Sequence, residues 1–152
     1  METIDKVNKI KLVCHKVLAN PNLLPREGKT YCNVGSALIL DELGYTTFVR
    51  NQETKEPFIA NEMCHIFDKS FERVDITKCI ELIDKGLIFV ACQEGNPHGH
   101  ICVIYPSKTT TFSKKWSMIV PLVANIGKVN EVCGLNFAFS ELPKIYLIGE
   151  PK

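Results

Sequence analysis

The sequence of 152 residues lacks the features that mark several large classes of protein. It has no long apolar run, because the longest ones, LIFVA and MIVPLVA, are far too short to span a bilayer as a helix. It also has almost no net charge, with 18 basic against 17 acidic residues, so the basic surface typical of nucleic-acid-binding proteins is missing. We therefore predict a protein that neither inserts into a membrane nor binds nucleic acid.

Cysteine usage excludes two further classes. The seven cysteines form no CxxC pair, which argues against a zinc ribbon and against a thioredoxin-type motif. The first twenty residues carry charges throughout and have no uninterrupted apolar core, so they do not predict a secretory signal peptide. An odd number of irregularly spaced cysteines without such a signal predicts a reduced chain whose thiols are mostly buried.

Length and composition indicate one ordinary globular domain. A chain of 152 residues can bury about two-thirds of the surface that its unfolded state exposes. Hydrophobic residues make up 45% and charged residues 23%, and both shares are typical of globular proteins. Neither a repeat nor a low-complexity linker divides the sequence, so we predict that residues 1–152 form a single domain.

Helical patterns dominate the first half of the chain. Apolar residues recur at helical spacing, and residues suited to helix ends bound the segments. Thr3 and Asp75 are predicted N-caps, while Gly44 and Gly86 are predicted to end helices. The predicted helices cover residues 3–19, the stretch from Cys32 to Gly44, a short segment that starts near Asn61, and residues 76–85.

From Gly86 onward the pattern changes to short β-branched or aromatic runs separated by turn residues. Short connections favour antiparallel pairing of consecutive strands, as in a meander. Helices followed by strands predict an α+β fold, with N-terminal helices packed on one face of a C-terminal antiparallel sheet of about five strands. The predicted strands cover residues 87–91, 100–105, 116–126, 136–139 and 144–148.

Cys32 begins the second predicted helix, directly after a loop marked by glycine and proline. The free N–H groups and positive dipole end of a helix N-terminus stabilise a thiolate, which is the nucleophilic form of cysteine. The polar neighbours Tyr31 and Asn33 predict partial exposure of the thiol. The alternative is that Cys32 is a core residue, the commonest position of a free cysteine.

Two histidines flank a glycine where the predicted strand 100–105 begins. Strand alternation places His100 on one face together with Cys102 and Ile104. A histidine in a strand has a fixed direction, whereas His98 lies in a loop of proline and glycine and is held less firmly. Since precise sites are built on rigid elements, His100 is the preferred general base for a cysteine nucleophile, and His98 is the alternative.

Asn125 is the candidate for the third group of such a site, which orients the imidazole in Cys-His-Asn triads. It ends the predicted strand that follows the His100 strand. In an antiparallel pair, the end of one strand lies beside the start of its neighbour. Asn125 also precedes Gly127 by two residues, and an Asn-x-Gly arrangement is typical of a turn. The alternative interpretation is that Asn125 only forms this turn.

The stretches TYCNVGSALILDELG, GLIFVACQEGNPHGHICVIYP and PLVANIG together resemble the papain-like cysteine amidases and endopeptidases. Within that superfamily the chain is most similar to the CHAP and NlpC-type peptidoglycan hydrolases. The resemblance covers roughly residues 28–127, and GHICVIY is its best-matching part. Tyr31 and Asn33 depart from the Asp and Ser-Gly that flank the cysteine in NlpC-type proteins, and Asn125 is closer to the CHAP and papain pattern.

The resemblance implies an enzyme that hydrolyses amide bonds, with bacterial cell-wall peptidoglycan peptides as substrate and without a cofactor or metal. Cys32 would attack the carbonyl, His100 would carry the proton, and backbone N–H groups at the helix start would hold the oxyanion. Tyr31, Asn33 and His98 are the expected substrate-binding residues. Such an enzyme would be cytoplasmic or would reach the cell wall by a non-classical route, through phage lysis or a secretion machine. The oligomeric state is not predicted.

Three alternatives compete with hydrolysis. Cys92, His98, His100 and Cys102 provide four zinc-type ligands within eleven residues, although their spacing matches no common zinc motif. A non-catalytic member of the same fold is the second alternative, because a fold alone does not establish a function. The third is an enzyme that keeps the nucleophile but transfers the acyl group to an amine or a thiol.

Overall fold

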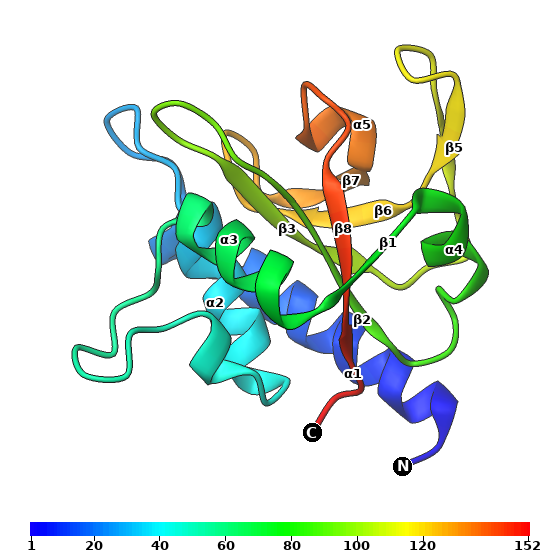
Figure 1. Ribbon diagram of the computed structural model, residues 1–152, viewed down its shortest axis with the longest axis horizontal. Helices are drawn as coiled ribbons and strands as arrows, with labels where there is room; N and C mark the ends of the chain where they lie inside the picture. The colour runs from blue at the N-terminus through cyan, green and yellow to red at the C-terminus, as the bar shows by residue number, and fades with distance from the viewer.

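The computed structural model describes residues 1–152 and contains five α-helices and two sheets (Figure 1). No helix has the length and apolar character needed to traverse a membrane. The helices, including two short 3-10 helices named η, are α1 (Thr3–Leu18), η1 (Pro21–Leu23), α2 (Cys32–Glu42), η2 (Thr46–Phe48), α3 (Ala60–Ser70), α4 (Ile76–Glu81) and α5 (Leu135–Ala138).

The main sheet has six strands in the order β1-β8-β2-β3-β6-β7, and all neighbouring strands are antiparallel. The predicted α+β class is therefore confirmed. The simple meander is wrong, because the last strand returns to pair between β1 and β2, and the sheet has six strands rather than about five. The strands are β1 (Glu72–Val74), β2 (Ile88–Gln93), β3 (His100–Tyr105), β6 (Leu122–Asn125), β7 (Glu131–Gly134) and β8 (Lys144–Gly149), with β4 (Thr111–Ser113) and β5 (Met118–Val120) forming a separate pair.

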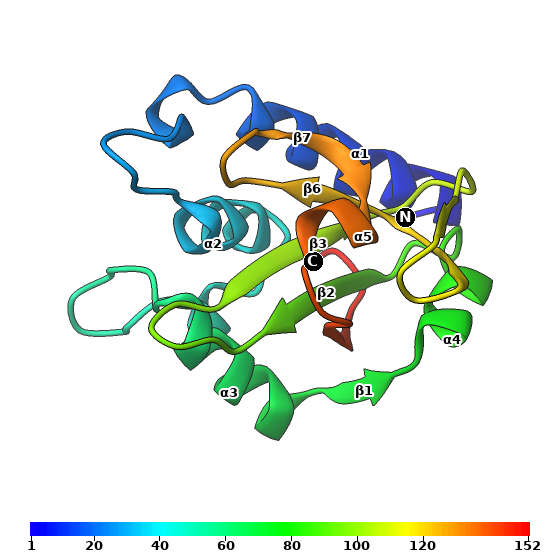
Figure 2. The ribbon, with the colours of Figure 1, turned by 90° about the horizontal axis from the view of Figure 1, so that it is seen from above.

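Helices cover both faces of the sheet, not one face as the sequence predicts. Figure 1 shows α5 above β6 and β7, with α1 and α2 below them. Viewed from above, α1 and α2 lie along one flank of the β2–β3 hairpin and α3 lies along the other (Figure 2). Two core clusters result, which we call the α1–α3 face and the α4–α5 face. Ile101 belongs to the first and Cys102 to the second, as the alternation of the strand predicts.

Helix α2 begins at Cys32, as predicted, and lies close to the sheet. Its Gly35 faces Ile126, just beyond the end of β6, and a Cβ atom on this glycine would overlap the isoleucine side chain. The small residue therefore lets the first turn of α2 approach β3 and β6. The helix ends at Glu42, and Gly44 follows in the left-handed region at φ +98°, which suits the predicted stop.

Several local predictions are wrong for identifiable reasons. Thr3 is not the cap of α1, because the helix begins at Thr3 itself and Glu2 occupies the cap position. The run 116–126 is split into β5 and β6 at Pro121, since proline has no N–H group to donate to a strand ladder. The predicted strand 136–139 is largely helix α5, preceded by the unpredicted strand β7.

Asp75 caps α4 as predicted, and its carboxylate accepts a 2.8 Å hydrogen bond from the Lys78 N–H. The helix is nevertheless shorter than the predicted 76–85, because it ends at Glu81 and continues as turns to Gly86.

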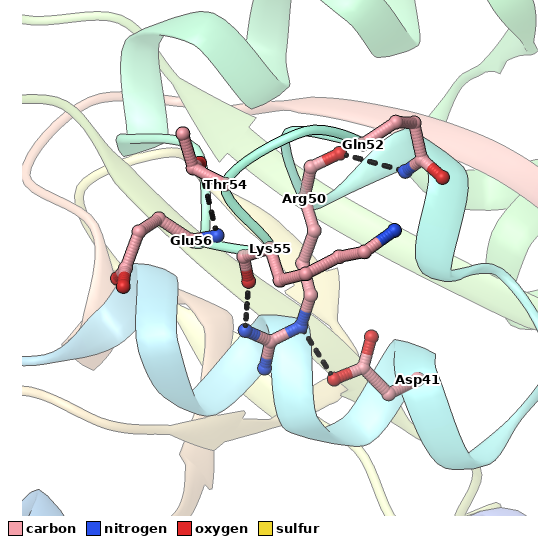
Figure 3. Close-up of polar contacts among 6 residues, drawn as sticks. All are labelled: Asp41, Arg50, Gln52, Thr54, Lys55 and Glu56. Carbon is pink, nitrogen blue, oxygen red and sulfur yellow. Dashed lines mark hydrogen bonds and ion pairs between the residues drawn. The ribbon is translucent and has the colours of Figure 1, made fainter.

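The polar loop 51–57 is fixed to the C-terminal part of α2 by Arg50 (Figure 3). The Arg50 Nε donates to Asp41 Oδ2 at 2.8 Å, and its Nη1 donates to the Lys55 carbonyl at 2.9 Å. Asp41 and Arg50 are both mostly shielded from solvent, so this ion pair is better protected from screening than the exposed pairs of the surface. The long loop is thereby held against the helix that begins with Cys32.

Candidate active site

His100 and Asn125 come together as the antiparallel arrangement predicts. Strand β6 pairs with β3, with Val103 opposite Ala124, so the end of β6 reaches the start of β3. The His100 Nε2 lies 2.9 Å from the Asn125 Oδ1. Both side chains project from the sheet toward the α4–α5 face, together with Cys102, whose sulfur lies 3.3 Å from the same imidazole nitrogen.

The orientation of the Asn125 amide determines the tautomer of His100. The Asn125 Nδ2 donates to the Val129 carbonyl at 3.1 Å, so the Oδ1 atom is the one that faces the imidazole. A carbonyl oxygen can only accept, and the His100 Nε2 must therefore carry the hydrogen. The lone pair of the neutral imidazole then resides on Nδ1, which can accept a proton.

The surroundings of His100 favour its neutral form. The Phe139 ring lies with its centroid 5.0 Å from that of the imidazole, tilted by 55°. Burial lowers the pKa of His100 below its ordinary value, while the hydrogen bond to Asn125 raises the pKa and partly offsets that effect. At neutral pH the imidazole is therefore a base rather than an imidazolium.

Cys32 occupies the first position of α2 but is only 8% exposed. Burial raises the pKa of the Cys32 thiol, while the backbone N–H groups of Ile101 and Asn33 lower that pKa by a smaller amount. The predicted partial exposure and stabilised thiolate are both wrong, because the α1–α3 core surrounds the sulfur. The helix-start N–H groups do favour the thiolate, but desolvation outweighs them. In the resting protein Cys32 is a thiol.

Cys32 lies beside the backbone of β3, on the α1–α3 face, whereas the His100 side chain projects toward the α4–α5 face, so the structure does not bring these two side chains together. The Ile101 N–H that acts on the Cys32 sulfur belongs to the residue directly after His100. One turn further along α2, the Ser36 hydroxyl donates to the Ile101 carbonyl at 3.4 Å. No hydrogen bond joins Cys32 to His100 directly. Cys32 lines one cavity and His100 another, and in enzymes in general catalytic hydrogen bonds are often formed only in the Michaelis complex.

A cavity of about 480 Å³ opens beside Cys32, and we call it the nucleophile-side cavity. The three predicted substrate-binding residues, Tyr31, Asn33 and His98, all line it. The amide nitrogen of Asn33 donates to the Phe58 carbonyl at 3.1 Å, so this side chain also ties α2 to the segment before α3. The cavity is thus bounded by the helix start, the preceding loop and the connection between β2 and β3.

A second cavity of about 300 Å³ lies beside His100, and we call it the histidine-side cavity. Glu94, Glu141 and Phe139 contribute to its lining. His98 and Gly99 line both cavities, so the two hollows adjoin along this segment. His98 therefore lies between the cavities, while His100 is the histidine that contacts Asn125.

Asn61 is a site residue that sequence reasoning does not identify. Its Nδ2 donates to the Gly95 carbonyl at 2.9 Å, and its Oδ1 accepts from the Gly95 N–H at 3.1 Å. A Cβ atom at Gly99 would overlap the Asn61 Oδ1. Asn61 thus fixes the segment 95–99 that leads into His100. Only the helix start near Asn61 is visible in the sequence, since the partner is 34 residues away.

The alternative zinc cluster does not form. Cys92 lies in the core of the α1–α3 face, whereas Cys102 lies in the core of the α4–α5 face. These two residues are therefore separated by the sheet, and the four candidate ligands do not converge. No group of three or more His, Cys, Asp or Glu side chains in the chain is placed to hold a metal ion.

Comparisons with known proteins do not assign this chain to a family. A scan of protein-family models and a search of curated proteins both find no match to this chain. The resemblance to papain-like hydrolases therefore stays a prediction.

Proposed function

We propose that this protein is a cysteine amidase or endopeptidase in which Cys32 is the nucleophile, His100 the general base and Asn125 the group that orients the imidazole. The observation that supports the proposal most is the 2.9 Å contact between His100 and Asn125, with the asparagine itself fixed by Val129. This arrangement leaves Nδ1 free to accept the thiol proton. The sequence resemblance supports amide bonds of peptidoglycan peptides as the substrate class.

The proposed reaction begins with the neutral pair. The Cys32 proton moves to His100 Nδ1 as the sulfur attacks the amide carbonyl, and the N–H groups at the start of α2 hold the oxyanion. The C–N bond then breaks, His100 returns the proton to the leaving amine, and an acyl-Cys32 intermediate remains. Water, deprotonated by the same imidazole, hydrolyses this intermediate and restores the thiol.

The test is digestion of purified peptidoglycan by the wild-type protein and by Cys32→Ala, with mass analysis of the released fragments. We expect fragments with new amino and carboxyl ends from the wild type, and a loss of at least about 10⁴-fold in rate with Cys32→Ala, as for other nucleophile deletions. Cys133→Ala is the matched control, because Cys133 is a half-buried thiol outside both cavities.

A parallel digestion with added glycinamide separates hydrolysis from acyl transfer. Free carboxyl ends indicate hydrolysis, whereas glycinamide adducts as the main product indicate a transferase. Fragments that are identical for wild type and Cys32→Ala, or no fragments from either, would contradict the proposed hydrolysis of peptidoglycan.

A further inference from the structure

The two cavities differ in charge. The histidine-side cavity is lined by two carboxylates, Glu94 and Glu141, and by neither lysine nor arginine. The nucleophile-side cavity is lined by one cation, Lys29, and by neither aspartate nor glutamate. A substrate that occupies both cavities therefore meets opposite electrostatic fields at its two ends.

The chemistry of acyl transfer assigns the two halves of such a substrate. The acyl part remains bonded to the Cys32 sulfur after the C–N bond breaks, so it occupies the cavity that Cys32 lines. The leaving amine takes its proton from His100, so it departs from the side that His100 lines. His98 and Gly99, which line both cavities, then lie beneath the scissile bond.

We propose that the histidine-side cavity is the leaving-group subsite and that Glu94 and Glu141 select substrates with a basic residue on the amine side of the scissile bond. This inference rests on the proposed function and names its specificity. In each turnover the Sγ–C bond forms, the C–N bond breaks, and the thiol proton passes through His100 to the amine, which leaves with its cationic side chain beside the two carboxylates.

A hydrogen bond holds the Glu141 carboxylate, and the backbone next to Glu94 is fixed by Asn61. The Gln93 Nε2 donates to the Glu141 Oε2 at 2.9 Å, which links the end of β2 to the segment after α5. Glu94 directly precedes Gly95, whose backbone is bound on both its N–H and its carbonyl by Asn61. Since both glutamates are exposed, each contributes a modest and salt-dependent preference, about two- to fivefold in affinity or kcat/KM.

The first experiment measures binding without turnover. Lysine amide and Nε-acetyl-lysine amide are titrated into the full chain carrying Cys32→Ala, and the imidazole NMR signals of His98 and His100 are followed. We expect lysine amide to shift these signals and to bind more tightly than Nε-acetyl-lysine amide, which keeps the same α-amino group but has a neutral side chain. Adding Glu94→Gln and Glu141→Gln should remove that difference, whereas Glu53→Gln, an exposed glutamate outside both cavities, should leave it unchanged.

The second experiment determines the cleavage specificity from the sequences of the products. The wild-type protein digests a defined peptide library, and the residue that begins each new amino-terminal fragment is determined by mass spectrometry. Lysine and arginine should be enriched, and the double glutamine variant should lose about 4- to 25-fold of that preference with little change for neutral residues.

The outcomes separate the two proposals. Cys32-dependent cleavage without enrichment of basic residues, or equal binding of the two amides, overturns the subsite assignment and leaves the proposed function standing. Tighter binding of lysine amide that requires the glutamates supports the subsite. Absence of any Cys32-dependent cleavage in the library and in peptidoglycan overturns the proposed function together with the specificity that rests on it.

Discussion

The two faces of the sheet contribute different parts of the candidate active site. The α1–α3 face has the larger core, a cluster of 25 buried residues that includes Cys32. The α4–α5 face has a cluster of 12 buried residues and carries His100, Cys102 and Asn125 beside Phe139. The nucleophile thus depends on helix packing, whereas the base depends on strand register.

This division has an energetic consequence. On the α1–α3 face, burial raises the pKa of the Cys32 thiol, and on the α4–α5 face burial lowers the pKa of the His100 imidazole. Both effects favour the neutral pair at rest. In the proposed mechanism, charge separation occurs when the proton moves during attack, so substitutions on the two faces should have distinguishable effects.

Among substitutions on the α4–α5 face, the largest effect should follow from removing the base. His100→Ala should lower kcat/KM for the peptide substrate by about 10²- to 10⁴-fold, because no other group then accepts the Cys32 proton. Steady-state kinetics with Cys133→Ala and His65→Ala as controls measure this. His65 is exposed on α3, and its substitution should leave the rate unchanged. A larger loss from His98→Ala than from His100→Ala would contradict the assignment of the base.

Two substitutions of Asn125 should move the pH profile in opposite directions. The neutral imidazole is the active form, so activity falls as pH drops through the pKa of His100. Asn125→Ala removes a hydrogen bond that raises this pKa, so the acid limb of kcat/KM should move to lower pH, with a rate loss of up to about 100-fold from misorientation. Asn125→Asp adds a negative charge that stabilises the imidazolium, so the limb should move to higher pH. Shifts in the same direction for both variants would exclude the proposed contact.

The smallest expected effect on the rate comes from a substitution in the core beside His100, and a substitution in the other core serves as its comparison. Phe139→Leu should reduce the burial of His100 and move the acid limb upward toward pH 6.5, with a stability loss of about 1–2 kcal/mol. Leu40→Ala, fully buried on the α1–α3 face, should cost about 2–5 kcal/mol of unfolding free energy without moving that limb. Denaturant titrations and pH–rate profiles measure both. An upward shift with Leu40→Ala would show that the two cores are coupled.

Local signals in the sequence are sufficient to predict where the helix and the strands that carry the candidate triad begin or end. The strand 100–105 has the bounds that its apolar run predicts, and α2 begins at the predicted Cys32. Asn125 ends its strand beside His100 because the pairing of β3 with β6 is antiparallel. Turn residues and side-chain periodicity fix these ends over a few neighbouring positions, so one sequence reveals them.

Other parts of the site depend on contacts between distant segments. Phe139 packs on His100 although the sequence pattern of residues 136–139 predicts a strand. Asn61 binds Gly95, which lies 34 residues further along the chain. The placement of α4 and α5 on the second face likewise has no local signal. Propensity describes what a segment prefers alone, and the packing of the whole chain overrides that preference at these positions.

The sequence by itself determined where the helix of Cys32 and the strand of His100 begin, and which face of that strand each residue occupies. Only the tertiary structure decided that Cys32 is a buried thiol, that Asn125 fixes the proton on His100 Nε2, and that two cavities of different charge adjoin at His98 and Gly99. The reason is physical: chain geometry is set by neighbouring residues, whereas desolvation and electric field depend on which distant elements surround a group.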